Sequence, residues 1–169
     1  MTLRTSAALP GIALRPIRPD DKHLLVAGLG RLSERSRYQR FLSAKPRLSP
    51  SELRYLTEVD HVDHVALVAV LAASPATLIG VGRWVRDTEH PNEAEIAIAV
   101  ADELQGRGVG TTIGRALADA ALDRGIVRFT ATMLPDNVAA HRLFEKISEH
   151  LAITRAYGVD ELVAELAAA

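Results

Sequence analysis

Cysteine is absent from this 169-residue chain. The absence excludes disulfide bonds, thiolate metal ligands and a cysteine nucleophile. It leaves the redox compartment undecided. Any acyl transfer that the protein performs cannot pass through an acyl-cysteine intermediate.

An excess of either charge is also missing. The 20 basic and 21 acidic residues give a formal net charge of −1, so no overall field attracts the protein to nucleic acid or to an anionic membrane. We therefore expect neither nucleic acid nor membrane as a partner, and any bound anion must be held by local groups. The oligomeric state stays open between monomer and homodimer.

Long apolar runs are missing as well. The opening stretch MTLRTSAALPGIALRP lacks an apolar segment of signal-peptide length, and no run could span a bilayer. A soluble, cytoplasmic protein is the expectation. Residues 1–10 show no periodic pattern and are predicted to be a flexible leader. Residues 11–169 suit one domain, since a chain of this size buries roughly 70% of its unfolded surface.

The hydrophobic pattern predicts a single α/β (α+β) domain whose mixed, mostly antiparallel sheet is flanked by helices. Helix caps and turn residues set the boundaries, such as Ser49 before Pro50 and the stop at Gly125. The expected strands cover 12–19, 64–72, 76–85, 95–101, 127–134, 151–155 and 159–166. The expected helices cover 20–32, 34–42, 50–56, 109–124 and 137–147.

Glycines 106, 108 and 110 directly precede an amphipathic helix pattern. Glycine lets backbone N–H groups approach a ligand, and a helix start adds unpaired N–H groups with partial positive charge. Together these features favour an anion site, most often for phosphate, although glycines can also make a simple tight turn. A P-loop is excluded because Thr111 and Thr112 replace its Lys-Ser/Thr pair. A dinucleotide fingerprint is disfavoured because ADELQ separates the loop from its strand.

The longer sequence around these glycines is more specific than the glycines alone. The segment QGRGVG (105–110), after the strand AEIAIAVADE, resembles the acetyl-CoA loop of the GNAT superfamily of N-acetyltransferases, whose pattern is Gln/Arg-x-x-Gly-x-Gly/Ala. The segment MLPDNVAAHRLFEKIS (133–148) resembles the second cofactor segment of that family, with Asn137 in the place of its helix-start asparagine.

The resemblance implies that acetyl-CoA is the cosubstrate. Backbone N–H groups of residues 107–111 would hold its pyrophosphate, with help from Gln105. The strand before the loop would bind the pantetheine and acetyl group through its backbone, and Asn137 would bind the pantetheine arm or cap its own helix. The implied cofactor-binding residues are Ile98, Val100, Gln105, Arg107, Gly108, Val109, Gly110, Thr111, Asn137 and Phe144.

Acetyl transfer to an amine needs a base, because an amine with a pKa of about 10 is mostly protonated at neutral pH. Glu95 matches a glutamate used as base in several GNAT protein acetyltransferases and is the predicted catalytic residue. Glu93 lies two residues away on the same face and could serve instead, or both could be solvated strand-end charges. Many GNAT enzymes have a tyrosine acid at the position where this chain has Phe144. The resemblance therefore leaves two alternatives: water protonates the thiolate, or the thiolate leaves without a proton.

The acceptor is less defined. The segments RPIRPDD and LSERSRYQRF resemble the catalytic domain of bacterial Pat-type protein lysine acetyltransferases. This favours acetylation of a protein lysine or another primary amine. A small-molecule amine acetyltransferase and a non-catalytic acyl-CoA sensor are the alternatives.

Two further motifs have ordinary interpretations. The segment DHVDH (60–64) is predicted to be a polar loop rather than a metal site, and we expect no metal. In RSRYQRF we expect Tyr38 and Phe41 in the core and the three arginines in solvent, although the segment could contribute to the acceptor site.

Overall fold

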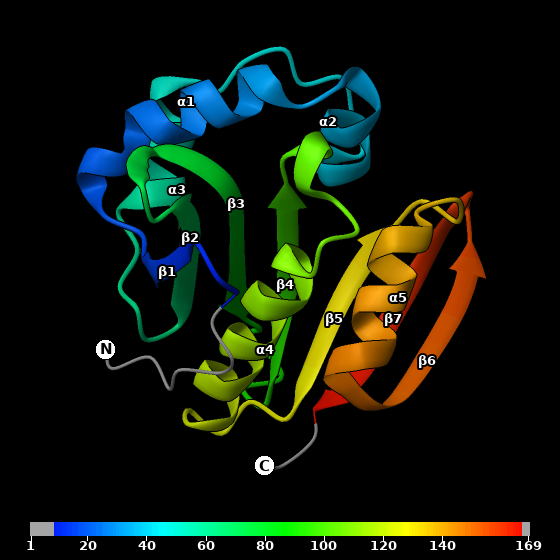
Figure 1. The fold of residues 1–169 in the computed structure, drawn as a ribbon. Coiled ribbons are helices and arrows are strands. Elements are labelled where there is room, and N and C mark those ends of the chain that lie inside the picture. Colours follow the sequence, from blue (N-terminus) through cyan, green and yellow to red (C-terminus); the bar gives the residue numbers. More distant parts are fainter. Residues whose placement is uncertain (1–8, 167–169) are drawn as a thin grey trace.

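A seven-stranded mixed sheet is the centre of the computed structural model, which describes residues 9–166 (Figure 1). Its strands lie in the order β1-β2-β3-β4-β5-β7-β6, and only β4 and β5 pair in parallel. The strands are β1 (Ile12–Pro16), β2 (His64–Leu71), β3 (Ser74–Arg86), β4 (Glu93–Val100), β5 (Arg128–Met133), β6 (Ser148–Ala156) and β7 (Val159–Leu166). The α-helices are α1 (Lys22–Arg31), α2 (Glu34–Phe41), α3 (Pro50–Thr57), α4 (Val109–Leu122) and α5 (Val138–Ile147).

The expected single α/β domain with a mixed sheet is confirmed, and most boundaries agree within a few residues. The clearest difference is β6, which begins at Ser148, immediately after α5, rather than at residue 151. This strand lies at the edge of the sheet and its residues are mostly exposed, so no apolar alternation marks where it starts. Most of the predicted leader lies outside the described residues.

Helices α4 and α5 cover one face of the sheet, with α4 over β2 to β4 and α5 beside it (Figure 1). The single tryptophan, Trp84 of β3, is fully buried there, and its Nε1 donates a hydrogen bond to the Leu117 carbonyl at 3.1 Å. Gly114 lets the two helices approach, because a Cβ at this position would lie 3.1 Å from Leu143 Cδ1. The position of α4 on the sheet is therefore closely defined.

Helices α1 and α3 cover the opposite face. Helix α1 buries Leu24, Leu25 and Leu29 against this face, each less than a tenth exposed. Gly28 faces the sheet on the same side of α1, where an added Cβ would lie only 2.8 Å from the Leu78 side chain. No helix within residues 9–166 has both the length and the apolar character needed to cross a membrane.

The pairing of β4 with β5 is short. It joins Glu93 to Arg128, Ala94 to Phe129 and Glu95 to Thr130, and then ends. β4 continues beside β3 up to Val100, whereas β5 follows β7. The two central strands therefore diverge, as Figure 1 shows.

The fit of α4 on β3 gives a stability prediction. A Cβ at Gly82 would lie 2.9 Å from Leu117 Cδ1 and closer still to Ile113 Cγ2. Gly82→Ala should lower the free energy of unfolding by about 1–3 kcal/mol, the usual cost of overpacking a core. Denaturant unfolding measures this change.

Gly30→Ala is the matched control. Gly30 lies within α1, and a Cβ there would have no neighbour within 4 Å. This variant should be as stable as the parent or up to about 1 kcal/mol more stable, because alanine favours helix. Equal stability of both variants would contradict the packing described for β3.

Candidate active site

A groove lies between the end of β4 and helix α5, with the glycine-rich loop at one end. We call it the β4–α5 groove. It brings together seven of the predicted cofactor-binding residues, Ile98, Val100, Gln105, Gly108, Gly110, Thr111 and Asn137. Segments that are about 40 residues apart along the chain thus line a single cavity.

The glycine-rich loop presents bare backbone to this groove. Gly106 and Gly108 have φ values of +74° and +87°, which only glycine adopts without strain, and a Cβ at Gly106 would have no neighbour within 4 Å. Helix α4 begins at Val109, and its first internal hydrogen bond runs from the Thr112 N–H to the Gly108 carbonyl at 2.9 Å. The N–H groups of residues 109–111 precede that bond, so the loop fits a bound anion such as a pyrophosphate.

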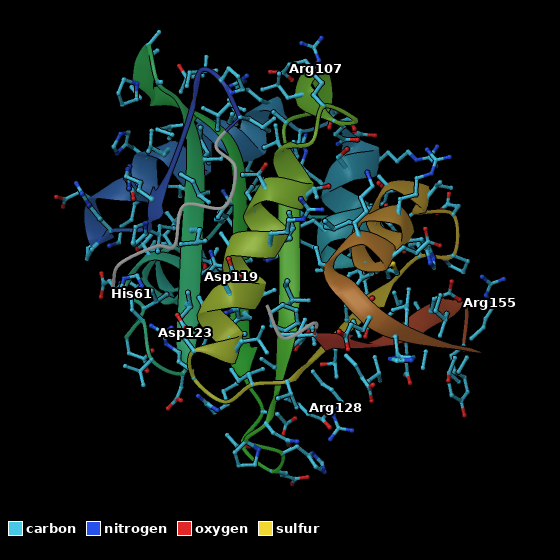
Figure 2. All side chains as sticks on the ribbon, turned by 60° about the horizontal axis from the view of Figure 1, so that its bottom comes forward. His61, Arg107, Asp119, Asp123, Arg128 and Arg155 are labelled. Carbon is cyan, nitrogen blue, oxygen red and sulfur yellow. The ribbon has the colours of Figure 1, made fainter. Side chains whose placement is uncertain are left out.

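Three predicted loop residues differ in what they can offer. Val109 is 2% exposed and belongs to the core cluster, so its side chain is not available to a ligand. Arg107 is exposed at the outer end of the loop, where its side chain points to solvent (Figure 2). The Gln105 amide instead faces the protein, and its Nε2 donates to the Val100 carbonyl and to Asp102 Oδ1, both at 3.2 Å. Gln105 therefore fastens the loop to the end of β4.

Asn137 caps α5. Its Oδ1 accepts a hydrogen bond from the Ala140 N–H at 3.2 Å. Among residues 9–166 its Nδ2 group has no hydrogen-bond partner, and the residue borders the groove. The capping role is thus present in the structure, and the cofactor-binding role stays a prediction.

Phe144 lies below the opening between β4 and β5. Phe144 is 5% exposed and belongs to the core between the helices α4 and α5 and the sheet. It also borders a cavity together with Thr132, Met133 and Asn137. The ring can contact a ligand in that opening, and it has no proton to donate.

The structure separates the two candidate bases. Glu95 is exposed, lies at the last β4–β5 pair and borders two cavities that residues of α2 also line. Glu93 stands earlier in the strand, where its Oε1 pairs with Arg128 Nη2 at 3.1 Å, and it borders none of these cavities. Of the two carboxylates, only Glu95 is available to a ligand at the opening.

Glu95 also faces a pocket of about 260 Å³, which is bordered by side chains of α2, α3, β3 and β4. We call it the polar pocket because four charged side chains line it: Arg40, Glu52, Arg83 and Glu95. Two arginines that sequence reasoning did not place there, Arg40 and Arg83, line it. Burial and then the nearby charge of Arg40 lower the pKa of Arg83 to about 9. Burial also lowers the pKa of Arg40, against the opposing effect of Glu95.

These positions correct the prediction for α2. Tyr38, expected in the core, is 47% exposed, whereas Arg40, expected in solvent, is half-buried. Helix α2 buries none of its residues fully, so its apolar pattern did not reveal which side faces the protein. Arg83 had a usable signal, because a charged residue inside the apolar strand VGRWV is unusual.

Arg142 and Lys146 were also missed. They lie one turn apart on α5 and border the β4–α5 groove. Their charges suit the phosphates that the glycine loop would hold.

The DHVDH loop has a structural role. Asp60 Oδ1 accepts hydrogen bonds from the N–H groups of Val62, Asp63 and His64 at 2.8–3.0 Å. No group of three or more potential metal ligands was found within residues 9–166.

The chain is similar to known proteins in sequence and in fold. The Acetyltransferase (GNAT) family profile matches residues 33–148. The chain is 34% identical over 134 residues to acetyltransferase Pat of Mycolicibacterium smegmatis, which covers 79% of this chain and 40% of that protein. It is 30% identical over 115 residues to acetyltransferase PA5475 of Pseudomonas aeruginosa, covering 68% and 61% respectively. The chain thus spans less than two thirds of either relative.

Solved structures are similar too. The GNAT domain of S. lividans PAT superposes with a TM-score of 0.81 at 34% identity, over 90% of this chain and 89% of that one. A cAMP-binding acyltransferase from Mycobacterium smegmatis gives 0.65 at 29% identity, over 93% and 44%. The structure of yncA from Salmonella typhimurium with its cofactor acetyl-CoA shares the fold, with a TM-score of 0.67 at 14% identity over 92% and 93%.

The two roles of Asn137 can be separated by substitution. Asn137→Ala removes the cap and should lower the free energy of unfolding by about 1 kcal/mol in denaturant titrations. Asn137→Asp keeps the capping oxygen but loses the amide donor. It should keep parental stability, and it should bind acetyl-CoA more weakly if Nδ2 contacts the cofactor. Unchanged stability of Asn137→Ala would contradict the cap.

Proposed function

Because the chain belongs to the acetyltransferase (GNAT) family and is related to Pat acetyltransferases, we propose that it transfers the acetyl group of acetyl-CoA directly to a primary amine. The observation that carries this proposal is the opening between β4 and β5, with the bare glycine loop at its end and Glu95 at its base. One opening thereby joins an anion site to a carboxylate.

In this proposal the chain's own residues bind and orient both substrates. The glycine loop, Arg142 and Lys146 hold the phosphates, and the backbone of Ile98 and Val100 fixes the pantetheine arm along β4. The Glu95 carboxylate, directly or through one water, takes a proton from the amine. The amine nitrogen then attacks the thioester carbonyl, the C–S bond breaks, and coenzyme A leaves as the thiolate.

Direct transfer fits the composition, because the sequence offers no cysteine to carry the acetyl group. Phe144 has no hydroxyl, so the thiolate takes its proton from water or leaves unprotonated. A thiolate is a tolerable leaving group, and holding the reactants in the correct geometry then supplies much of the rate.

A protein lysine is the first candidate acceptor, because the N-terminal half resembles Pat-type protein lysine acetyltransferases. A small-molecule amine is the second candidate, because the polar pocket beside Glu95 is walled by α2, α3, β3 and β4.

Gly108→Asp tests the cofactor site. The added carboxylate would face the phosphates, and like charges about 4 Å apart repel by about 4 kcal/mol at an effective dielectric of 20. Isothermal calorimetry should show acetyl-CoA binding weakened by at least about 100-fold.

Gly125→Asp is the matched control, because Gly125 also has a positive φ, +73°, with open space around its Cβ position, and it follows the opposite end of α4. It introduces the same charge and the same backbone strain away from the groove and should bind acetyl-CoA like the parent. Parental affinity of Gly108→Asp would refute the assignment of the loop.

Glu95→Gln tests the base. The variant should bind acetyl-CoA normally but turn over about 10²- to 10⁴-fold more slowly, the usual worth of a positioned base. Raising the pH should restore part of the rate, because more of the amine is then unprotonated. A kcat–pH profile with a reactive amine measures both effects.

Glu93→Gln is the control for the neighbouring carboxylate and should keep near-parental turnover. The reverse result would move the base by two residues. Parental rates in both variants would mean that solvent deprotonates the acceptor.

A further inference from the structure

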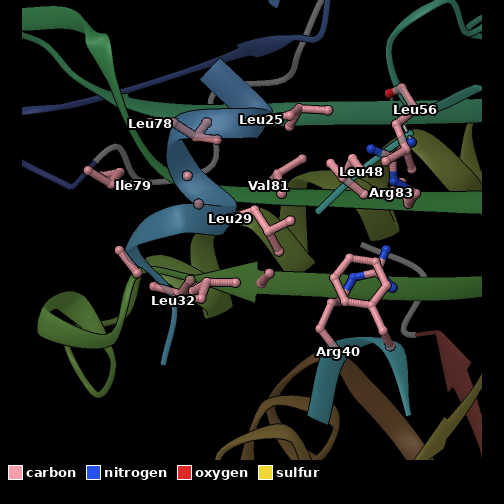
Figure 3. A pocket seen from close by; sticks show the side chains of 16 residues that line it. Leu25, Leu29, Leu32, Arg40, Leu48, Leu56, Leu78, Ile79, Val81 and Arg83 are labelled. Atoms are coloured by element: carbon pink, nitrogen blue, oxygen red, sulfur yellow. Dashed lines mark hydrogen bonds between the residues drawn. The ribbon is translucent and has the colours of Figure 1, made fainter. Parts of the chain in front are cut away.

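Two guanidinium groups face the same small volume beside Glu95. Arg40 enters from α2 and Arg83 from β3, and both border the polar pocket and the adjoining apolar pocket (Figure 3). Arg83 is 6% exposed, and its pKa of about 9 keeps it charged at neutral pH. The pocket wall therefore carries two positive charges.

Neither arginine is neutralised by a structural ion pair within residues 9–166. Arg83 Nη1 donates to the Leu56 carbonyl at 3.0 Å and lies 3.0 Å from His64 Nε2. His64 is uncharged at neutral pH, because burial and then the charge of Arg83 lower its pKa to about 4. Arg40 makes no hydrogen bond to a described residue, and its guanidinium lies only over the Phe41 ring at 4.9 Å.

The carboxylates of the pocket do not balance these charges. Glu52 is already committed, since Lys45 and the Ser49 N–H bind its two oxygens and lower its pKa to about 2. Glu95 is the other carboxylate that borders the pocket, and it makes no ion pair with a described residue. With Glu95 ionised, two cations face one available anion, which leaves an excess of one positive charge.

Arg40 is half-buried and its guanidinium makes no hydrogen bond to a described residue. The strongest partner for such a group is a carboxylate bound through two parallel N–H groups. A lysine ammonium alone would add a further positive charge to this pocket. An acceptor that brings its own carboxylate would instead satisfy Arg40 and leave the amine beside Glu95.

We infer that the acceptor is a small aliphatic α-amino acid, whose carboxylate binds Arg40 and Arg83 while its amine faces Glu95. This inference rests on the proposed function. In an α-amino acid one carbon separates the two groups, which suits a carboxylate site and a base that border the same pocket.

The adjoining apolar pocket supplies the place for the side chain. It is lined by Leu25, Leu29, Leu48, Leu78 and Val81 and opens beside the two arginines (Figure 3). An aliphatic side chain would be buried there, whereas a charged one would lose its hydration.

The test compares matched acceptors under saturating acetyl-CoA. L-leucine, L-valine and L-alanine are each paired with their carboxamides, and acetyl products are identified by mass spectrometry. The acids should have kcat/KM values about 10- to 100-fold above those of the amides, which is the worth of hydrogen bonds to a charged group. Amine ionisation cannot produce this preference, because amino acid amides are the weaker bases and supply more free amine.

Arg40→Gln should remove the preference by raising KM for L-leucine about 10- to 100-fold while leaving leucinamide unaffected. Its melting temperature should not fall, because the substitution breaks no hydrogen bond and removes a half-buried charge. Arg35→Gln is the matched control on the same helix. Arg35 pairs with Asp136 at 3.1 Å outside the pocket, so that variant should keep the parental preference.

Lysine peptides form a second arm, with glutamate or glutamine beside the target residue. A preference for glutamate peptides without acetylation of free amino acids would overturn the inference, because the carboxylate would then come from a protein. Equal use of acids and amides would also overturn it, while the acetylated products would leave the proposed function standing. Acetyl-CoA binding with no acetylated amine in either arm would refute the proposed function itself.

Discussion

The short parallel pairing of β4 with β5 is the constraint on which the site depends. β4 stays paired with β3 up to Val100 and β5 with β7, whereas the pairing of β4 with β5 ends at Glu95 and Thr130. A strand edge without a neighbour presents unpaired N–H and C=O groups. The opening therefore comes from the sheet itself, and the backbone along it is available to a ligand.

The packing of α4 sets where the anion site meets this opening. Glycines of β3 let the helix approach the sheet, Trp84 hydrogen-bonds to its backbone, and Gln105 fastens the preceding loop to the end of β4. The helix start and the edge of β4 therefore form parts of one rigid frame. Preorganised donors of this kind cost little reorganisation when a charged group binds. Arg83 and the half-buried Arg40 line the neighbouring pocket beside Glu95.

Much of the fold and the position of the glycine-rich loop could be predicted from local patterns. Glycine spacing, helix caps and buried strands leave strong signals, because each reflects the conformation or burial of a few neighbouring residues. Signals fail where burial is partial. β6 is an exposed edge strand and α2 has no fully buried residue. The predicted start of β6 and the predicted orientations of Tyr38 and Arg40 were therefore wrong. The assigned roles of the site residues stay predictions.

The sequence alone determined the family resemblance, the position of the glycine-rich loop before α4, the order of elements and the absence of a cysteine nucleophile, because all of these are local or compositional properties. Only the tertiary structure distinguished the surroundings of Glu93 and Glu95, since Arg128 from β5 pairs with the first carboxylate and the second lies beside the opening. It also brought Arg40 and Arg83 into one pocket from segments more than 40 residues apart. Charge pairing and desolvation depend on distances between distant segments, which no local pattern encodes.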